Sequence, residues 1–385
     1  MNALKKWFTS LGLLILLAAL VSFHLKGESQ ILFLLQESFP MAQITRGQGD
    51  VECYLIKEKG AASKRIYPSQ PTGWGGPMVV APVVDKNLAL EEVVILKHRE
   101  TPAFFDYVKT SGFLGQFQSK THMDPLALQT DIDAVTGATI TSRAITRGVR
   151  EAMDQAAWEL LGVKPTEKRA EIHFGFREAL LLSLFGLTFV AVKKKWRKAR
   201  LPILAASFLF LGLMTKSPVS VSNIAALLMG HGPTLSEHLF WWILVPGSLV
   251  FVALLGKNAW CGWLCPFGAI QEGILRTGGL KLSVPKPLQK PLKSAPKIVA
   301  LAALLAAFIS GNASRASVEP FATLFGLKGA PWQWYLVSFA IAGSFLIPRF
   351  WCRYFCPAGV CFTCAAKTKH QCRKLTKKGI TSLSA

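Results

Sequence analysis

The chain has 385 residues, 51% of them hydrophobic, and its 44 basic and 22 acidic side chains give a formal net charge of +22. This length allows two domains. The basic residues flank apolar blocks and do not form a basic face with interleaved aromatic residues, which argues against binding of nucleic acid.

The first apolar block, residues 11–23, predicts an N-terminal membrane anchor over residues 1–24. A cleaved signal peptide is the alternative, but residues 21–25 are too bulky around the expected cleavage point. We therefore favour an uncleaved anchor, and we expect residues 31–39 to lie near the membrane surface.

The next segment, residues 25–173, contains the run Asp-Ala-Val-Thr-Gly-Ala-Thr at residues 133–139. Small residues on both sides leave the Thr139 hydroxyl open to an enzyme and to a phosphate group, and the nearby Asp133 can orient it. Ser, Thr and Gly are also common in turns. The alternative is therefore a surface turn that leads into a helix over about residues 142–161.

This run resembles the flavin attachment site of the FMN-binding domain of the NosR, RnfG and NqrC proteins, in which a transferase esterifies the FMN phosphate onto the last Thr. Upstream segments recur in the same order: residues 72–77, the strand-like 78–84 and 93–96, then 99–102 and 113–117. The resemblance implies an α+β FMN-binding domain over residues 25–173, FMN held by a phosphoester to Thr139, and a flavin transferase as partner. The implied cofactor-binding residues are Gly75, Gly76, Glu100, Thr101, Asp133, Thr136, Gly137, Ala138, Thr139 and Thr141.

Five more apolar blocks follow, over residues 179–192, 201–214, 239–255, 298–309 and 332–347. Several are shorter than the roughly 20 residues that a membrane helix prefers, so flanking Lys, Arg and Trp side chains must lie at the interface. The fold class that we predict is a polytopic α-helical membrane protein of about six spans, with the α+β domain inserted after the first span.

Charge predicts the orientation. Residues 25–173 hold 17 basic and 18 acidic residues, which leaves 27 basic against 4 acidic residues elsewhere. The basic excess lies in alternate loops, at residues 193–200, 276–297 and 367–378, and such loops remain in the cytoplasm. We therefore expect both termini inside, the FMN-binding domain outside, a five-span membrane domain over residues 174–366, a basic tail over 367–385, and a place in the bacterial inner membrane.

Seven of the eight cysteines follow residue 173, and four of them form an internal repeat. Residues 260–268 and 351–359 share the pattern Trp-Cys-x-aromatic-x-Cys-Pro-x-Gly. Residues four apart share a helical face, and the Pro then redirects the chain. Four thiolates suit an iron–sulfur cluster or zinc, and buried structural cysteines are the third reading. The candidate ligands are Cys261, Cys265, Cys352 and Cys356.

This repeat is similar to the membrane part of the NosR, NapH and RdhC proteins, whose cysteine pairs are taken to be redox centres. We favour a 4Fe-4S cluster, although the spacing itself does not define the cluster type. No pair of full ferredoxin motifs follows, so the layout is closer to the shorter RdhC type. Cys361, Cys364 and Cys372 could form a second metal site, because Cys356, Cys361 and Cys364 have a 2Fe-2S-like spacing. Cys356 cannot serve two sites, and the other reading of these three is free thiols.

Three outer-loop features carry weaker signals. His231 and His238 could touch a quinone or a haem, although a loop histidine is commonly solvated. Residues 320–325 could dock beneath the FMN-binding domain or form an interfacial aromatic segment.

The predicted function is electron transfer, as one component of an oxidoreductase system. Electrons would pass from quinol or a cytoplasmic donor, through the cysteine centre and FMN, to a periplasmic reductase or another acceptor. The hydrocarbon core is about 30 Å thick, so something must bridge the two cofactors. The alternatives are a membrane redox sensor or regulator, a maturation factor for a periplasmic reductase, and a structural subunit that has lost its flavin.

Overall fold

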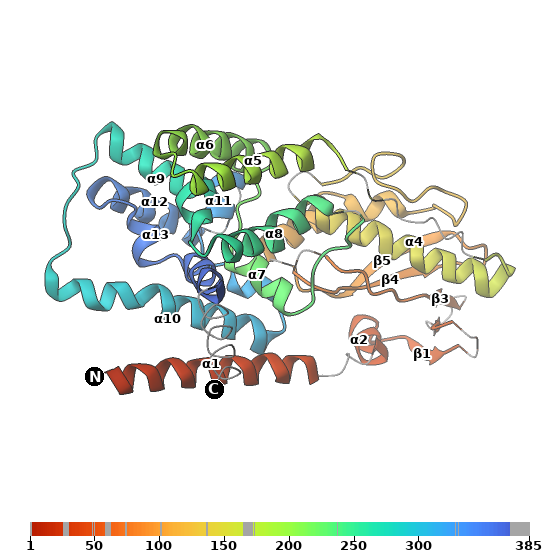
Figure 1. Cartoon of the computed structure of the whole chain (residues 1–385). Helices are drawn as coiled ribbons and strands as arrows, with labels where there is room; N and C mark the ends of the chain where they lie inside the picture. Colours follow the sequence, from red (N-terminus) through yellow and green to blue (C-terminus); the bar gives the residue numbers. More distant parts are fainter. Residues whose placement is uncertain are drawn as a thin grey trace, which may run out of the picture.

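The computed structural model describes residues 2–25, 31–47, 49, 51–57, 63–73, 75–100, 102–135, 138–164, 172, 174–236, 238–327, 329 and 331–369. A small sheet with its covering helices forms one end of the molecule, and a bundle of helices forms the other (Figure 1). The N-terminal helix α1 (Asn2–Leu25) runs alongside α10 of the bundle and leads toward the sheet.

The sheet has five antiparallel strands in the order β1-β2-β3-β4-β5, so each strand pairs with its neighbours in sequence. The predicted strands at residues 78–84 and 93–96 are β4 and part of β5. The strands are β1 (Gln43–Arg46), β2 (Tyr54–Lys57), β3 (Lys64–Ile66), β4 (Val79–Val84) and β5 (Leu90–Lys97).

Both faces of the sheet are covered, because side chains alternate between the faces along a strand. Val80 and Val84 share a core with α4 (Thr139–Leu161). Ala81 and Val83 share a second core with α2 (Ile31–Ser38). Ile31 and Leu35 pack on the sheet and are buried, whereas Leu32 and Phe33 on the other face of α2 are exposed. The expectation that residues 31–39 lie near the membrane surface stays a prediction. Two further elements, α3 (Pro102–Thr110) and η1 (Phe113–Phe117), complete this part.

Each of the six apolar blocks forms helix. The bundle contains α5 (Phe176–Lys193), η2 (Arg197–Ala199), α6 (Arg200–Ser207), the π-helical η3 (Phe208–Met214), α7 (Val221–Leu228), α8 (Leu239–Leu255), the π-helical η4 (Trp260–Leu264), α9 (Pro266–Thr277), α10 (Lys286–Ser310), η5 (Ala313–Ala316), α11 (Phe321–Gly326), α12 (Pro331–Leu346) and α13 (Phe350–Tyr354). Residues 357–369 form a final helix.

One helical stretch within the described residues, Pro291–Ser310, is both long and apolar enough to cross a membrane. The segments Leu14–His24 and Leu239–Leu255 are apolar but shorter. The structure therefore has one strong span candidate within a largely helical chain that also carries a small antiparallel sheet.

The bundle contains an internal repeat that is longer than the cysteine motif. A short helix (α7), an apolar helix (α8), the motif and a helix that begins at the motif proline (α9) occur in that order. The same order recurs as α11, α12, the second motif with α13, and the helix over residues 357–369. The two cysteine motifs thus belong to two similar halves of one bundle.

Candidate functional site

Thr139 is the first residue of α4 and is exposed, whereas Ala138 before it and Thr141 after it are buried. The start of α4 has no side-chain cap at Ala138 and no acidic residue in its first turn. The first N–H groups of a helix lack intrahelical partners, and the helix dipole favours an anion there. An exposed hydroxyl at such a position fits a phosphoester.

Buried hydrogen bonds hold the chain before Thr139 in place. The Ser142 hydroxyl accepts from the Val135 N–H (3.2 Å) and donates to the Ala138 carbonyl (3.1 Å). Gln116 pairs with both backbone groups of Asp133, at 2.7 Å and 3.2 Å. Asp133 is therefore positioned through its main chain, and its own side chain is exposed.

Glu100 joins the start of α4 to the glycine turn at residues 73–76. Its carboxylate is buried, accepting from the Thr141 hydroxyl (2.8 Å) and from the Gly75 N–H (3.2 Å). Three other predicted flavin contacts, Thr101, Thr136 and Gly137, lie outside the described residues.

Gly75 and Gly76 face the helical bundle. A Cβ built at Gly75 would collide with the Arg99 carbonyl and lie 2.9 Å from the Ser314 hydroxyl. At Gly76, where φ is +135°, it would lie 2.8 Å from His231 Nδ1. Glycine thus permits close approach of the two parts of the chain. A contact of these glycines with flavin stays a prediction.

Arg99 and His231 connect the sheet part to the bundle. Arg99 Nη1 donates to His231 Nε2 (3.1 Å), so the neutral ring carries its proton on Nδ1, which has no hydrogen-bond partner among the described residues. Burial, with the nearby Arg99 and His24, lowers the pKa of His231 to about 4. The Arg99 guanidinium also lies 5.7 Å from the centre of the Phe23 ring. His231 is therefore a buried structural contact, unlike the solvated loop histidine that was the alternative.

The first turns of α4 contact the loop between α7 and α8. Arg147 donates to the Thr234 hydroxyl. Burial, with Arg143 and Arg147 close by, lowers the pKa of His238 to about 4. The helix that starts at Thr139 thus rests on the loop over residues 231–238.

Four cysteines come together inside the bundle, Cys261 and Cys265 from the first motif and Cys352 and Cys356 from the second. The Cys352 and Cys356 thiols lie near enough to interact electrostatically with both thiols of the first motif. These four residues are called the cysteine cluster below.

Each motif breaks its helix before the second cysteine. Cys265 has an extended backbone (φ −71°, ψ 116°) and precedes α9 as its N-cap, and the Phe267 and Gly268 N–H groups point at its sulfur. Cys356 likewise lies between α13 and the helix over residues 357–369. The expectation that each pair shares one continuous helical face is therefore wrong, because the proline after the second cysteine starts a new helix.

The donor set and the space around it fit an iron–sulfur cluster. A Cβ added to Gly359 would lie 3.8 Å from Cys356 Sγ and 3.9 Å from Cys261 Sγ, and one added to Gly268 would lie 3.9 Å from Cys265 Sγ. The motif glycines thus keep open the space beside the sulfurs. Within the described part of the chain, no three His, Cys, Asp or Glu side chains form a site for a single metal ion.

The remaining C-terminal cysteines are only partly described. Cys361 is partly buried and Cys364 is exposed, and they lie one turn apart in the helix over residues 357–369. Cys372 lies outside the described residues. A second metal site from these three cysteines stays a prediction.

The segment between α10 and α11 reaches from the sheet part to the cysteine cluster. Its Ser314 hydroxyl donates to the Arg99 carbonyl (3.4 Å). Five residues later, the buried Glu319 accepts from the Val221 N–H (2.8 Å) and interacts electrostatically with Cys356. Five residues span at most about 18 Å, so a short segment leads from the sheet part to the cysteine cluster.

Residues 320–325 do not lie beneath the sheet part, as one reading expected. Phe321 and Phe325 are buried in a core with Phe267, Trp351 and Cys356. Helix α11 therefore packs beside the cysteine cluster.

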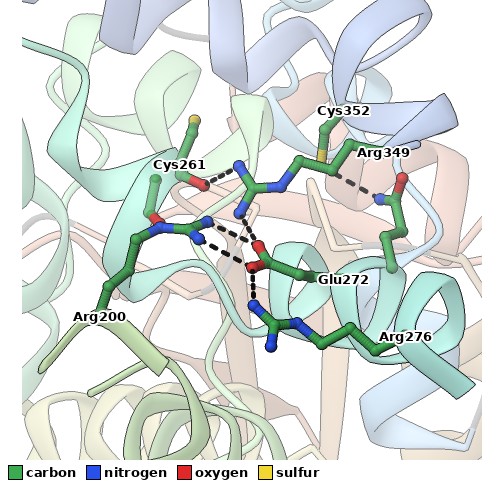
Figure 2. A network of polar contacts seen from close by, with 8 residues as sticks. Arg200, Cys261, Glu272, Arg276, Arg349 and Cys352 are labelled. Carbon is green, nitrogen blue, oxygen red and sulfur yellow. Dashed lines mark hydrogen bonds and ion pairs between the residues drawn. The ribbon is translucent and has the colours of Figure 1, made fainter. Parts of the chain in front are cut away.

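Sequence reasoning missed the polar residues that tie the two motifs together. Glu272 accepts from Arg200 (2.8 and 2.6 Å) and from Arg349 (2.8 Å), and Arg349 also donates to the Cys261 carbonyl (3.2 Å), as Figure 2 shows. Burial alone would raise the pKa of Glu272, but the two arginines outweigh it and lower the pKa to about 2.

The buried Gln271 donates to Cys352 Sγ (3.1 Å) and accepts from the Trp351 N–H (3.1 Å). The available signal for these polar residues was their position in the sequence, because Arg349 lies three residues before Cys352 and Glu272 lies seven residues after Cys265.

Comparison with known proteins assigns both regions. Residues 73–154 match the FMN-binding domain family, and residues 237–285 and 335–377 match the 4Fe-4S binding domain family. The chain therefore combines an FMN-binding domain with a 4Fe-4S binding domain.

Relatives support the same combination. Protein NirI of Paracoccus denitrificans is 34% identical over 209 residues, covering 49% of this chain and 30% of NirI. Regulatory protein NosR of Pseudomonas aeruginosa is 29% identical over 212 residues, covering 49% of this chain and 29% of NosR. One component of the proton-translocating ferredoxin:NAD(+) oxidoreductase complex of Clostridium ljungdahlii is 32% identical over 113 residues, covering 28% of this chain and 60% of that component.

The predicted resemblance to NosR-type proteins is confirmed, because the chain matches FMN-binding and 4Fe-4S binding domain models and is similar to parts of NirI and NosR. Its matched region spans about 30% of the length of NirI.

Proposed function

We propose that this chain is a multi-pass electron-transfer flavoprotein of the bacterial inner membrane. The proposal gives it about six spans, cytoplasmic termini and an FMN-binding domain on the periplasmic side. The alternation of basic loops along the six apolar helices supports this topology.

FMN is held, in this proposal, by a phosphoester to Thr139. FMN supplies a carrier of one or two electrons. The chain contributes an exposed hydroxyl at the start of α4, with N–H groups aimed at the phosphate. Glu100 fixes the start of α4 against the glycine turn through Thr141 and Gly75.

The cysteine cluster holds a 4Fe-4S centre in this proposal, with Cys261, Cys265, Cys352 and Cys356 as ligands. Such a centre supplies one-electron transfer at a potential set by its surroundings. The bundle buries Cys356, leaves the other three cysteines partly exposed, and directs N–H groups at two of the sulfurs, those of Cys265 and Cys352.

One observation carries the electron-transfer proposal: the glycine turn beside the start of the flavin attachment helix and the cysteine cluster meet the same short segment. Gly75 and Arg99 pack on Ser314, and Glu319, five residues later, lies by Cys356. A cysteine cluster recessed into the bundle shortens the gap across the membrane. Of the three possible bridges between the cofactors, a bound quinone, a partner protein and a recessed cysteine centre, the proposal takes the recessed centre.

The donor is quinol or a cytoplasmic reductant, and the acceptor a periplasmic reductase or another extracytoplasmic redox protein. A flavin transferase is the partner needed for maturation. The position of this chain among redox relatives, which include a component of an oxidoreductase complex, supports these partner classes.

The attachment is tested by expressing the full chain with a flavin transferase and viewing a denaturing gel for flavin fluorescence. The wild-type band should fluoresce, Thr139→Ala should be dark, and Thr130→Ala, at an exposed position outside the motif, should remain fluorescent. A dark wild-type band despite an active transferase, or a fluorescent Thr139→Ala band, would refute attachment at Thr139.

A membrane redox regulator is the second candidate, because two relatives bear the name regulatory protein NosR. The two functions separate in a deletion strain. Loss of acceptor reduction at normal acceptor abundance supports the carrier, and altered transcription of the acceptor genes supports the regulator.

A further inference from the structure

The helix that follows each cysteine motif holds the other motif. Arg349 and Asn258 each lie three residues before the first cysteine of their motif, while Glu272 and Thr363 each lie seven residues after the second cysteine. Arg349 donates to Glu272 (2.8 Å), and Asn258 donates to Thr363 (3.1 Å). The two contacts are therefore equivalent in the repeat, as they would be across a twofold axis.

The two side chains also contact the backbone of the opposite motif. Arg349 donates to the carbonyl of Cys261 in the opposite motif (3.2 Å), and Asn258 donates to the carbonyl of Gly359 in the opposite motif (3.3 Å). Each motif is thus positioned by a side chain from the other half.

The two equivalent pairs differ in charge. Asn258 and Thr363 are neutral, whereas Arg349 and Glu272 are ionised and belong to a larger network. Arg200 binds Glu272 bidentately and donates to the Gly262 carbonyl (3.0 Å). Figure 2 shows Arg200, Arg276 and Arg349 converging on the one Glu272 carboxylate. One side of the cysteine cluster therefore carries three cations and one anion, in a region where Glu272 is 12% exposed.

The charge of Arg349 acts on the cluster directly. Its guanidinium interacts electrostatically with the thiols of Cys261, Cys265 and Cys352. Reducing the centre adds one negative charge among these sulfurs. A fixed cation nearby stabilises that added charge, and a fixed anion destabilises it, more strongly away from water than in it.

We propose that Arg349 and Glu272 are positioning residues that set the reduction potential of the cysteine cluster from one side, Arg349 raising it and Glu272 lowering it. The proposal rests on the proposed iron–sulfur function. It adds that the two equivalent pairs of the repeat differ in charge, with the neutral Asn258–Thr363 pair as the built-in reference.

The test is a redox titration of the purified full-length holoprotein, followed by the spectroscopic signal of the cluster, with iron and sulfide assayed in each sample. Arg349→Gln should lower the midpoint potential, and Glu272→Gln should raise it. Arg349→Lys, which keeps the positive charge, should have a midpoint potential close to that of the wild type. Thr363→Val, which removes the equivalent neutral contact, should shift the potential less than either charge variant.

Opposite shifts separate this role from scaffolding, because a purely structural loss would disturb both charge variants in the same direction. Intact clusters with no shift, or with shifts of one sign, would overturn the proposal. If Arg349→Gln does not fold, the other two variants still test the proposal. Glu272→Gln should raise the midpoint potential strongly, and Arg349→Lys should leave it nearly unchanged. Absence of iron from the wild-type protein would instead refute the underlying iron–sulfur function.

Discussion

Arg99 donates a 3.1 Å hydrogen bond to His231, joining the FMN-binding domain to the helical bundle at the edge of the glycine turn. This contact holds the glycine turn, which Glu100 joins to the start of α4, against the bundle. Domain docking is therefore part of the proposed electron path.

Arg99→Ala should weaken this docking. The substitution removes a hydrogen bond from a charged group and the cation–π contact with Phe23. We expect a loss of about 1–3 kcal/mol of docking free energy, the usual range for such bonds. Faster backbone hydrogen exchange over residues 231–236 would report it. Arg46→Ala, at an exposed position of β1, is the control and should leave that exchange unchanged.

Docking should also weaken in acid. The pKa of His231 falls from its usual 6.5 to about 4 when it is buried beside Arg99 and His24. The docked state therefore binds fewer protons between pH 6.5 and 4, so stability is complete above pH 6.5 and declines as pH falls toward 4, by on the order of 3 kcal/mol. The same exchange measurement across pH should show this slope. His231→Asn should flatten the profile, and an unchanged slope in that variant would exclude His231 as the titrating group.

Gly75→Ala should destabilise the protein. The added methyl group would meet the Arg99 carbonyl, which belongs to the backbone and cannot move aside cheaply. Overpacking of this kind costs about 1–3 kcal/mol. Thermal unfolding of the full chain in detergent measures the loss. The matched control is Gly115→Ala, where an added Cβ meets no atom within 4 Å, and equal melting temperatures for the two variants would contradict the close approach.

Gln271→Ala should loosen the cysteine cluster. The buried amide contacts Cys352 Sγ and the Trp351 N–H, both at 3.1 Å, and its loss leaves a buried donor without a partner, at a cost of about 1–3 kcal/mol. Iron release from the holoprotein to a chelator should accelerate. The exposed Gln118 offers the control, because Gln118→Ala should release iron at the wild-type rate.

The helices were largely predictable from sequence. Long apolar runs become helices because the backbone must satisfy its own hydrogen bonds in an apolar setting, and the predicted block at residues 239–255 coincides with α8. The strands at residues 78–84 and 93–96 were also found, since β-branched residues fill both. The packing of Ile31 and Leu35 on the sheet was not predicted, because an apolar helix has the same pattern whether it covers a sheet or a membrane surface.

The contacts at the site were less accessible from sequence. Spacing within one motif predicted the four cysteines, but not that each motif is held by the opposite half, because that depends on how two helices meet in space. Aligning the two motifs would have shown Asn258 opposite Arg349 and Thr363 opposite Glu272, at equal offsets. The docking role of Gly75 and Gly76 could not be predicted from sequence. A glycine indicates that another group comes close to the backbone, but the sequence does not show which group it is.

Electron transfer from the cysteine cluster to the flavin is tested most directly in inside-out membrane vesicles, whose lumen would contain the FMN-binding domain. A reductant that cannot cross the membrane is added outside, and the absorbance of the flavin is followed. We predict flavin reduction with the wild-type protein and little or none with Cys352→Ala at equal flavin content, while dissolving the vesicles in detergent should let the reductant reach the flavin in both. Equal flavin reduction in the intact vesicles of both proteins would contradict the proposed path.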